Sequence, residues 1–159
     1  MRGLLVQTRK EMSTWTKAEM GIVGGFTASV MMGLSIVVLT AFGLIQVPWF
    51  SVVGYMFGAT GPAYAASVSG LIWFMGEGAI AGFIFAFFFR SYSVNKGLGF
   101  SALGLIITAL ILSGVVVQPF TGTLVSMGLG AALTLFVPLA VAYVIWGIVM
   151  GVIARRYLR

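Results

Sequence analysis

Cysteine and histidine are both absent from these 159 residues, and only three residues are acidic. Without thiolates or imidazoles, the chain cannot form disulfides, zinc–thiolate sites or histidine-ligated haem, and it has no histidine for acid–base catalysis. No nucleophile–base–acid set can be assembled from the other residues, and the glycine-rich phosphate-binding motif is missing. We therefore expect no cofactor, no metal site and no enzyme activity from this chain on its own.

Charge is also scarce. Charged residues make up 8% of the chain, hydrophobic residues make up 60%, and the mean hydropathy is +1.12. Soluble domains carry about 25% charged residues, so a soluble fold of this composition would leave a large apolar surface in water. We expect one integral membrane domain. The net charge of +6 could suggest nucleic-acid binding, but the placement of the cations argues against it.

Four long apolar segments predict four transmembrane helices, at about residues 20–45, 65–89, 97–117 and 129–154. Residues 20–159 would form this domain. Residues 1–19 mix cations with apolar side chains, which predicts a basic amphipathic segment at the membrane surface. A signal peptide is the less favoured alternative, because its apolar region would begin too late and run too long.

Local signals predict how these helices begin and end. Thr16 and Glu19 form a capping box, so the first helix should begin at Lys17. Gln46 and Pro48 should end it, because proline cannot donate to a continuing helix. The uncharged residues 47–64 predict an aromatic interfacial loop, with a short helix lying on the bilayer as one arrangement. In the last helix, Pro138 predicts a kink.

The nine cations all fall on one side of this topology: four before the first helix, two between the second and third, and three after the fourth. Because positive charge stays on the cytoplasmic side, both termini should be cytoplasmic in the cell membrane. The cations then serve as anchors for anionic lipid, and no nucleic-acid partner is expected. The predicted fold is an all-α bundle of four transmembrane helices built from two helical hairpins.

Small residues recur every fourth position on three helices, and we interpret them as helix-packing faces. They are Gly21, Gly25, Ser29 and Gly33 on the first helix, Gly78 and Gly82 on the second, and Gly147 and Gly151 on the fourth. In addition, Gly25-Phe26-Thr27-Ala28 resembles Gly99-Phe100-Ser101-Ala102. A duplicated hairpin, with an axis along the membrane normal, would explain this match, and so would the common pattern of membrane helices.

Glu77 is the one acidic residue inside an apolar segment, about 20 Å along the helix from Arg90. An ionisable group at mid-membrane suggests a site in a proton or ion pathway. Alternatively, a neutral carboxyl could hydrogen-bond between helices, to Ser35, Thr108 or Ser113, or could bond to a partner subunit. The sequence favours this structural interpretation, because a single acid makes no relay.

Four features of this sequence occur in a characteristic order. The first helix is glycine-rich with paired methionines (GIVGGFTASVMMGL), GAIAGFIFAFFF closes the second, a Gln-Pro-Phe-Thr-Gly turn follows the third, and a GxxxG precedes a basic end. In this layout, over about residues 21–153, the chain resembles a family of small four-helix prokaryotic membrane proteins catalogued as a domain of unknown function. The resemblance implies the four-helix fold and brings no activity. Members often carry a histidine in the second and fourth helices, near Trp73 and Leu139 here, so no histidine-dependent role carries over.

From these features, the sequence favours a non-catalytic accessory or structural subunit of a larger membrane complex, for example a respiratory electron-transfer complex. Its partners would be the lipid bilayer and other membrane subunits. The alternative is a small homo-oligomeric transporter or channel with Glu77 in a proton or ion pathway. A membrane chaperone or assembly factor is a third, less favoured interpretation.

Overall fold

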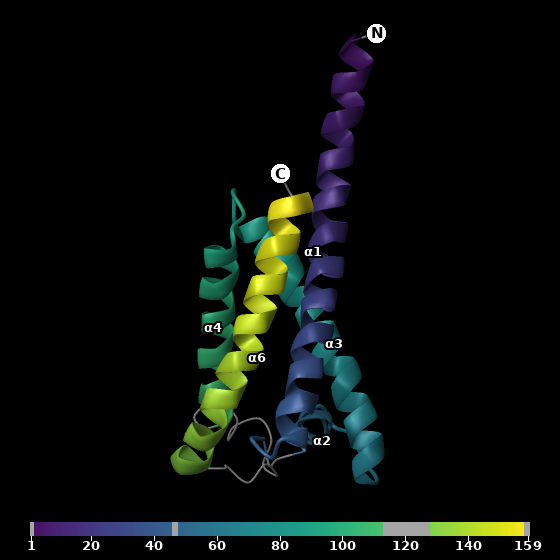
Figure 1. Ribbon diagram of the computed structural model, residues 1–159. Helices are drawn as coiled ribbons and strands as arrows, with labels where there is room; N and C mark the ends of the chain where they lie inside the picture. Colours follow the sequence, from purple (N-terminus) through teal and green to yellow (C-terminus); the bar gives the residue numbers. More distant parts are fainter. Residues whose placement is uncertain (1, 46–47, 113–127, 158–159) are drawn as a thin grey trace.

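The computed structural model describes residues 2–45, 48–112 and 128–157, with side chains at 16–45, 48–55, 57–111 and 136–157. In this part of the chain it contains five helices and no strand, which confirms the all-α prediction (Figure 1). The helices are α1 (Arg2–Ala41), α2 (Trp49–Met56), α3 (Ala63–Phe88), α4 (Val94–Leu112) and α6 (Gly128–Tyr157).

Four of these helices are long and apolar enough to cross a membrane, over Thr16–Ala41, Ala63–Phe88, Val94–Ile111 and Phe136–Tyr157. Their outer faces are apolar as well: Val23, Leu34 and Ile80 are each more than half exposed. Water would penalise such a surface, whereas lipid would not. The four spans therefore indicate a multi-pass membrane protein.

The start of α1 differs from the prediction. α1 is one continuous helix from Arg2, and its first turns project beyond the ends of the other helices (Figure 1). Thr16 therefore lies inside the helix, and the predicted start at Lys17 is wrong. Residues 4–20 contain neither proline nor glycine, so nothing in the sequence interrupts the helical hydrogen bonds.

Gly43, and not Pro48, ends α1. Gly43 has φ +72°, its N–H donates to the Thr40 carbonyl (2.9 Å), and the Leu44 N–H donates to the Leu39 carbonyl (2.9 Å). This is the Schellman arrangement, in which a left-handed glycine lets the chain turn back onto the last carbonyls of the helix. The first helix thus ends at Ala41, earlier than the predicted residue 45.

The short helix in the first loop is α2, and it packs against α3. Trp49 and Val53 are buried in the core, and Ser51 Oγ lies 2.6 Å from Ser67 Oγ on α3. Gly70 of α3 allows this close approach because it has no side chain. A methyl group added there would overlap the carbonyl oxygen of Phe50. Contacts with the protein therefore hold α2 in place.

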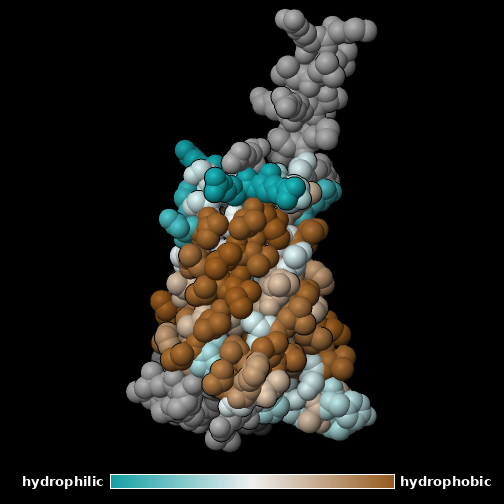
Figure 2. Space-filling view, viewed as in Figure 1, coloured by the Kyte–Doolittle hydropathy of each residue, from teal (hydrophilic) through white to brown (hydrophobic). Residues whose placement is uncertain are grey.

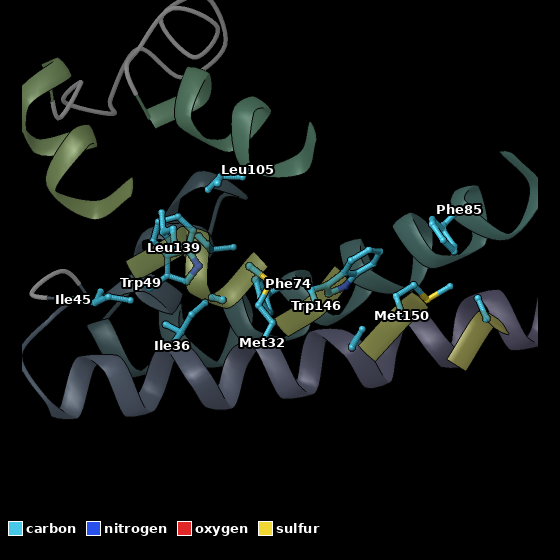
Figure 3. Close-up of a cluster of buried hydrophobic side chains, with 14 residues drawn as sticks. Met32, Ile36, Ile45, Trp49, Phe74, Phe85, Leu105, Leu139, Trp146 and Met150 are labelled. Atoms are coloured by element: carbon cyan, nitrogen blue, oxygen red, sulfur yellow. The ribbon is translucent and has the colours of Figure 1, made fainter. Parts of the chain in front are cut away.

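The long helices are arranged in the order α3, α1, α6, α4: α1 packs against α3 and α6, and α4 packs against α6. The buried core lies along the inner faces, and Met32, Phe74 and Trp146 lie together near its centre (Figure 3). α3 and α4 are therefore the outer members. Pro138 lies within α6, which is helical on both sides of it.

The cations whose side chains are described gather at one end of the bundle, which we call the basic end: Lys17, Arg90, Lys96, Arg155 and Arg156. There, Lys17 Nζ lies over the rings of Phe87 (5.4 Å) and Tyr92 (5.8 Å). The two arginines are in the last turn of α6. Figure 2 shows a hydrophilic band at this end, next to a hydrophobic belt that covers the middle of the visible face.

Candidate functional site

A pocket of about 300 Å³ lies inside the bundle, with walls from α1, α3, α4 and α6. Its walls combine a carboxylate, hydroxyls and aromatic rings, chiefly Phe74, Glu77, Phe100, Thr108, Tyr143 and Trp146. Glu77 on α3 and Ile107 on α4 line it and are both exposed. The pocket therefore opens at the surface between α3 and α4, the two outer helices.

Glu77 is near the middle of α3, about 17 Å along the helix from its last residue, Phe88, and Arg90 lies beyond that end. Among the described residues, its carboxyl makes no hydrogen bond and no ion pair. Ser35, one predicted partner, instead donates to the Met32 carbonyl of its own helix (2.6 Å). Ser113, another, lies outside the described residues. Glu77 thus faces the pocket without a partner from this part of the chain.

Thr108 was the third predicted partner of Glu77, and it pairs with a different residue. Thr108 Oγ1 lies 2.5 Å from Tyr143 OH, which joins α4 to α6 at the back of the pocket. Both hydroxyls line the same pocket as Glu77. The carboxylate and this hydroxyl pair therefore share one space without being bonded to each other.

Aromatic rings close the pocket toward the basic end. The ring of Phe100 on α4 packs edge-on against Phe85 of α3 (5.5 Å between centroids, 74°) and stacks on Trp146 of α6 (6.0 Å, 26°). Phe85 is fully buried. α3 and α4 therefore meet through these rings near the basic end, and the pocket lies beyond them.

The predicted small-residue faces of α1 and α3 lie against each other. A methyl group added at Gly25 would overlap the carbonyl oxygen of Gly78 and lie 2.7 Å from Cα of Gly82. One added at Gly21 would lie 2.9 Å from the Gly82 carbonyl oxygen, and one at Gly78 would overlap Ser29 Oγ. Only hydrogen fits at these positions, so the two backbones are in direct contact.

Gly33, the remaining predicted position on α1, contacts aromatic rings. A methyl group there would lie 3.6 Å from Phe50 of α2 and 3.7 Å from Phe74 of α3, at ordinary contact distance. Gly33 is thus part of the same packing face, but with room for a small side chain.

The contact between α4 and α6 has the same form. A methyl group added at Gly147 would lie 2.5 Å from Ser101 Oγ and 2.9 Å from the Gly97 carbonyl oxygen. One added at Gly151 would lie 2.7 Å from Cα of Val94. Sequence reasoning did not assign Gly97 and Ser101 to a packing face, although they stand four residues apart like the small residues of α1.

These two contacts correspond residue by residue. Gly78 of α3 meets Ser29 and Gly25 of α1, just as Gly147 of α6 meets Ser101 and Gly97 of α4. The packing therefore aligns Gly25 with Gly97, two residues away from the alignment with Gly99 that the sequence comparison favoured. The two registers differ because the helix contacts depend on the small residues, whereas the sequence match also depends on the phenylalanines beside them.

The correspondence pairs Glu77 with Trp146, since each directly precedes the equivalent glycine. Trp146 Nε1 donates to Ser29 Oγ of α1 over 3.1 Å. The equivalent contact would join Glu77 to Ser101, but Ser101 Oγ donates to the Leu98 carbonyl of its own helix (3.0 Å). The two halves of the bundle therefore differ at this position, where the pocket lies.

Side-chain size explains the difference. Small residues of α1 allow close packing on α6. A methyl group added at Gly24 would lie 3.1 Å from Ile153 and 3.2 Å from Met150, and Ala28 is fully buried. In the aligned register, α4 has Lys96 and Phe100 at these positions. The larger side chains keep α4 away from α3, which leaves the pocket open.

Sequence reasoning did not identify the aromatic walls of the pocket. Tyr143 and Trp146 fall in the middle of the last span, away from the interfaces where such residues usually gather. Their position in the middle of a span, where polar aromatic residues are uncommon, was the feature of the sequence that could have identified them. Of the two positions where the resembling family often has histidine, Trp73 is exposed and stacks on Phe57 (4.5 Å), and Leu139 is buried in the core.

Compared with known proteins, the chain matches no family model, no curated protein and no solved structure.

Proposed function

We propose that this chain is a small membrane transporter whose pathway passes through the pocket at Glu77. The observation that carries the proposal is an unpaired mid-membrane carboxyl in a pocket between two equivalent helix pairs. Intramembrane acids are costly and usually mark a pathway, and transporters built from repeats bind their substrates near the midplane at the repeat interface. This reverses the order that the sequence favours, because no hydroxyl predicted to pair with Glu77 does so in the described residues.

In the proposed arrangement, the transporter lies in the cell membrane with the basic end toward the cytoplasm, so both termini are cytoplasmic. The pairs α1/α3 and α4/α6 are its two hairpins, related by an axis along the membrane normal. It acts as a homo-oligomer. The gathering of the described cations at one end supports this orientation.

The test is flux in liposomes that contain the purified chain. We expect proton or cation flux above that of empty liposomes, and we expect Glu77→Gln to abolish it. Glu19→Gln is the matched control, because Glu19 is an exposed acid on α1 outside the pocket and its replacement should leave flux unchanged. Absence of flux from the intact chain would overturn the proposal.

A second candidate is the accessory subunit of a larger membrane complex, and a separate observation favours it. Gly76 on α3 and Gly99 on α4 are exposed, and a methyl group added at either would meet nothing within 4 Å. Small residues on an outer face allow the helix of another subunit to approach closely. The described part of the chain leaves both positions uncovered.

Native mass in mild detergent separates the two candidates, when every co-purifying chain is identified. A hetero-complex, especially one with haem absorbance, supports the accessory role, since this chain has no histidine or cysteine to hold haem. If Glu77→Ala dissociates that complex and the intact chain shows no flux, the transporter proposal fails. A homo-oligomer with flux that depends on Glu77 excludes the accessory role.

A further inference from the structure

We propose that the pocket binds a lipophilic organic cation, with the Glu77 carboxylate as its counter-charge and the aromatic walls around its apolar body. This inference rests on the proposed function and names its class of substrate. The evidence is the charge balance of the pocket, the identity of its walls, the state of its hydroxyls and the place where it opens.

The charge balance comes first. An ionised carboxylate in a low-dielectric site is strongly unfavourable unless a cation compensates it. The described cations cannot do so, because they are at the basic end. Lys96 Nζ, for example, lies over the Phe89 ring (5.5 Å) and donates to the Ser91 carbonyl (2.9 Å). A positively charged ligand would supply the counter-charge that the described residues withhold.

The walls fit the apolar part of such a ligand. Phe74, Phe100, Tyr143 and Trp146 present four aromatic rings to the pocket that also contains Glu77. A cation over an aromatic face is attracted by the negative face of the ring, most strongly where water is excluded. The volume of about 300 Å³ is at the lower end of the roughly 300–1,000 Å³ typical of small-molecule sites. The pocket therefore suits a small organic cation with one ring.

The hydroxyls argue against a metal ion as the ligand. Hard divalent cations take about six oxygen ligands, and the pocket offers one carboxylate. Its hydroxyls are already engaged: Thr108 pairs with Tyr143, Ser29 accepts from Trp146, and Ser101 donates to the Leu98 carbonyl. An organic cation needs no such shell, because a single carboxylate and aromatic faces suffice.

The mouth of the pocket completes the argument. It opens between α3 and α4 beside exposed apolar side chains, Ile80 on α3 and Leu103 and Ile107 on α4. Such a rim is in contact with lipid in a membrane-spanning bundle. A lipophilic cation that has partitioned into the bilayer would therefore reach Glu77 without crossing water.

The test is binding of benzyltrimethylammonium to the purified full chain in nanodiscs, by equilibrium dialysis against empty nanodiscs. Neopentylbenzene is the neutral probe of the same shape, with carbon in place of nitrogen. We expect saturable binding of the cation, at least tenfold weaker binding in Glu77→Gln, and unchanged binding in Glu19→Gln. The neutral probe should not respond to Glu77→Gln.

Glu77→Asp keeps the charge and should retain more affinity than Glu77→Gln, while helix content measured by circular dichroism shows that each variant folds. Equal binding of the two probes, or equal affinity of Glu77→Gln and the unchanged chain, would overturn the inference. Binding without flux would support this inference and refute the transport function. Proton flux that depends on Glu77, without binding of the organic cation, would support the transport function and refute this inference.

Discussion

The indole N–H of Trp146 on α6 donates to the hydroxyl of Ser29 on α1 over 3.1 Å, and both residues are buried. This bond joins the two helix pairs on the side where they pack closely. On the other side, the equivalent residue is Glu77, which has no partner among the described residues and faces an open pocket. This hydrogen bond thus helps to close one side of the bundle. On the other side no equivalent bond forms among the described residues, and the pocket stays open.

Loss of this bond should destabilise the protein. Trp146→Phe removes the donor but keeps most of the ring, so we expect a loss of about 0.5–1.5 kcal/mol in the free energy of unfolding in detergent. Ser29→Ala should cost a similar amount, and the double variant little more, because both changes break one bond. Trp73→Phe is the control: Trp73 is exposed and makes no described hydrogen bond. Additive losses in the double variant would contradict this interpretation.

The backbone contact between α1 and α3 makes a second prediction. Gly25→Ala places a methyl group against the Gly78 carbonyl and 2.7 Å from Cα of Gly82, so the helices must separate. We expect a loss of about 1–3 kcal/mol, measured by denaturant or thermal unfolding of the purified chain. Gly76→Ala is the matched control, because nothing lies within 4 Å of the added methyl. Equal stability of the two variants would show that the backbones of α1 and α3 are not in direct contact at Gly25.

The turn after α1 makes a third prediction, which depends on backbone conformation alone. Gly43 has φ +72° with open space around it, so a side chain there is strained without any clash. Gly43→Ala should therefore cost about 1–2 kcal/mol, and Gly43→Asn less, because asparagine tolerates the left-handed region. Gly99→Ala, at an exposed helical position, serves as the comparison. No difference between Gly43→Ala and Gly99→Ala would mean that this turn is not required.

Topology can be tested with single cysteines, since the chain has none of its own. Thr60→Cys lies between α2 and α3, and Asn95→Cys lies in the first turn of α4 at the basic end; both positions are exposed. In intact cells, a membrane-impermeant maleimide should label Thr60→Cys directly and Asn95→Cys only after permeabilisation. The opposite pattern would place the basic end, and both termini, outside the cytoplasm.

The predictions from sequence succeeded where a feature depends on residues close together in the chain. Apolar runs predicted four transmembrane helices, and the described residues contain four helices long and apolar enough to be spans. The predicted end of the third helix at residue 117 lies outside the described residues. Trp49–Met56 falls in the loop where a short helix is one predicted arrangement. Two errors were local as well. At the end of α1, Gly43 is the stronger stop signal than Pro48, because a left-handed glycine completes the last turn of the helix. At its start, the capping pattern at Thr16 does not begin a helix, because no proline or glycine interrupts the residues before it.

The pocket could not be predicted in the same way. Glu77 stood out as the only acid in an apolar segment, but the sequence does not say which helices face it. That depends on pairs of distant residues, such as Gly24 against Met150 on the closed side and Phe100 against Phe85 on the open side. Tyr143 and Trp146 acquire a meaning only when α6 brings them to the same space as Glu77.

By itself, the sequence determined what lipid and water select along a single chain: four apolar spans, with every cation near an end of a span or outside the spans. These are sums over neighbouring residues, because the cost of transfer into a bilayer is nearly local. The tertiary structure decided which helix faces meet. Packing of small and large side chains across separate helices closes one side of the bundle with Trp146 and leaves Glu77 exposed to a pocket on the other.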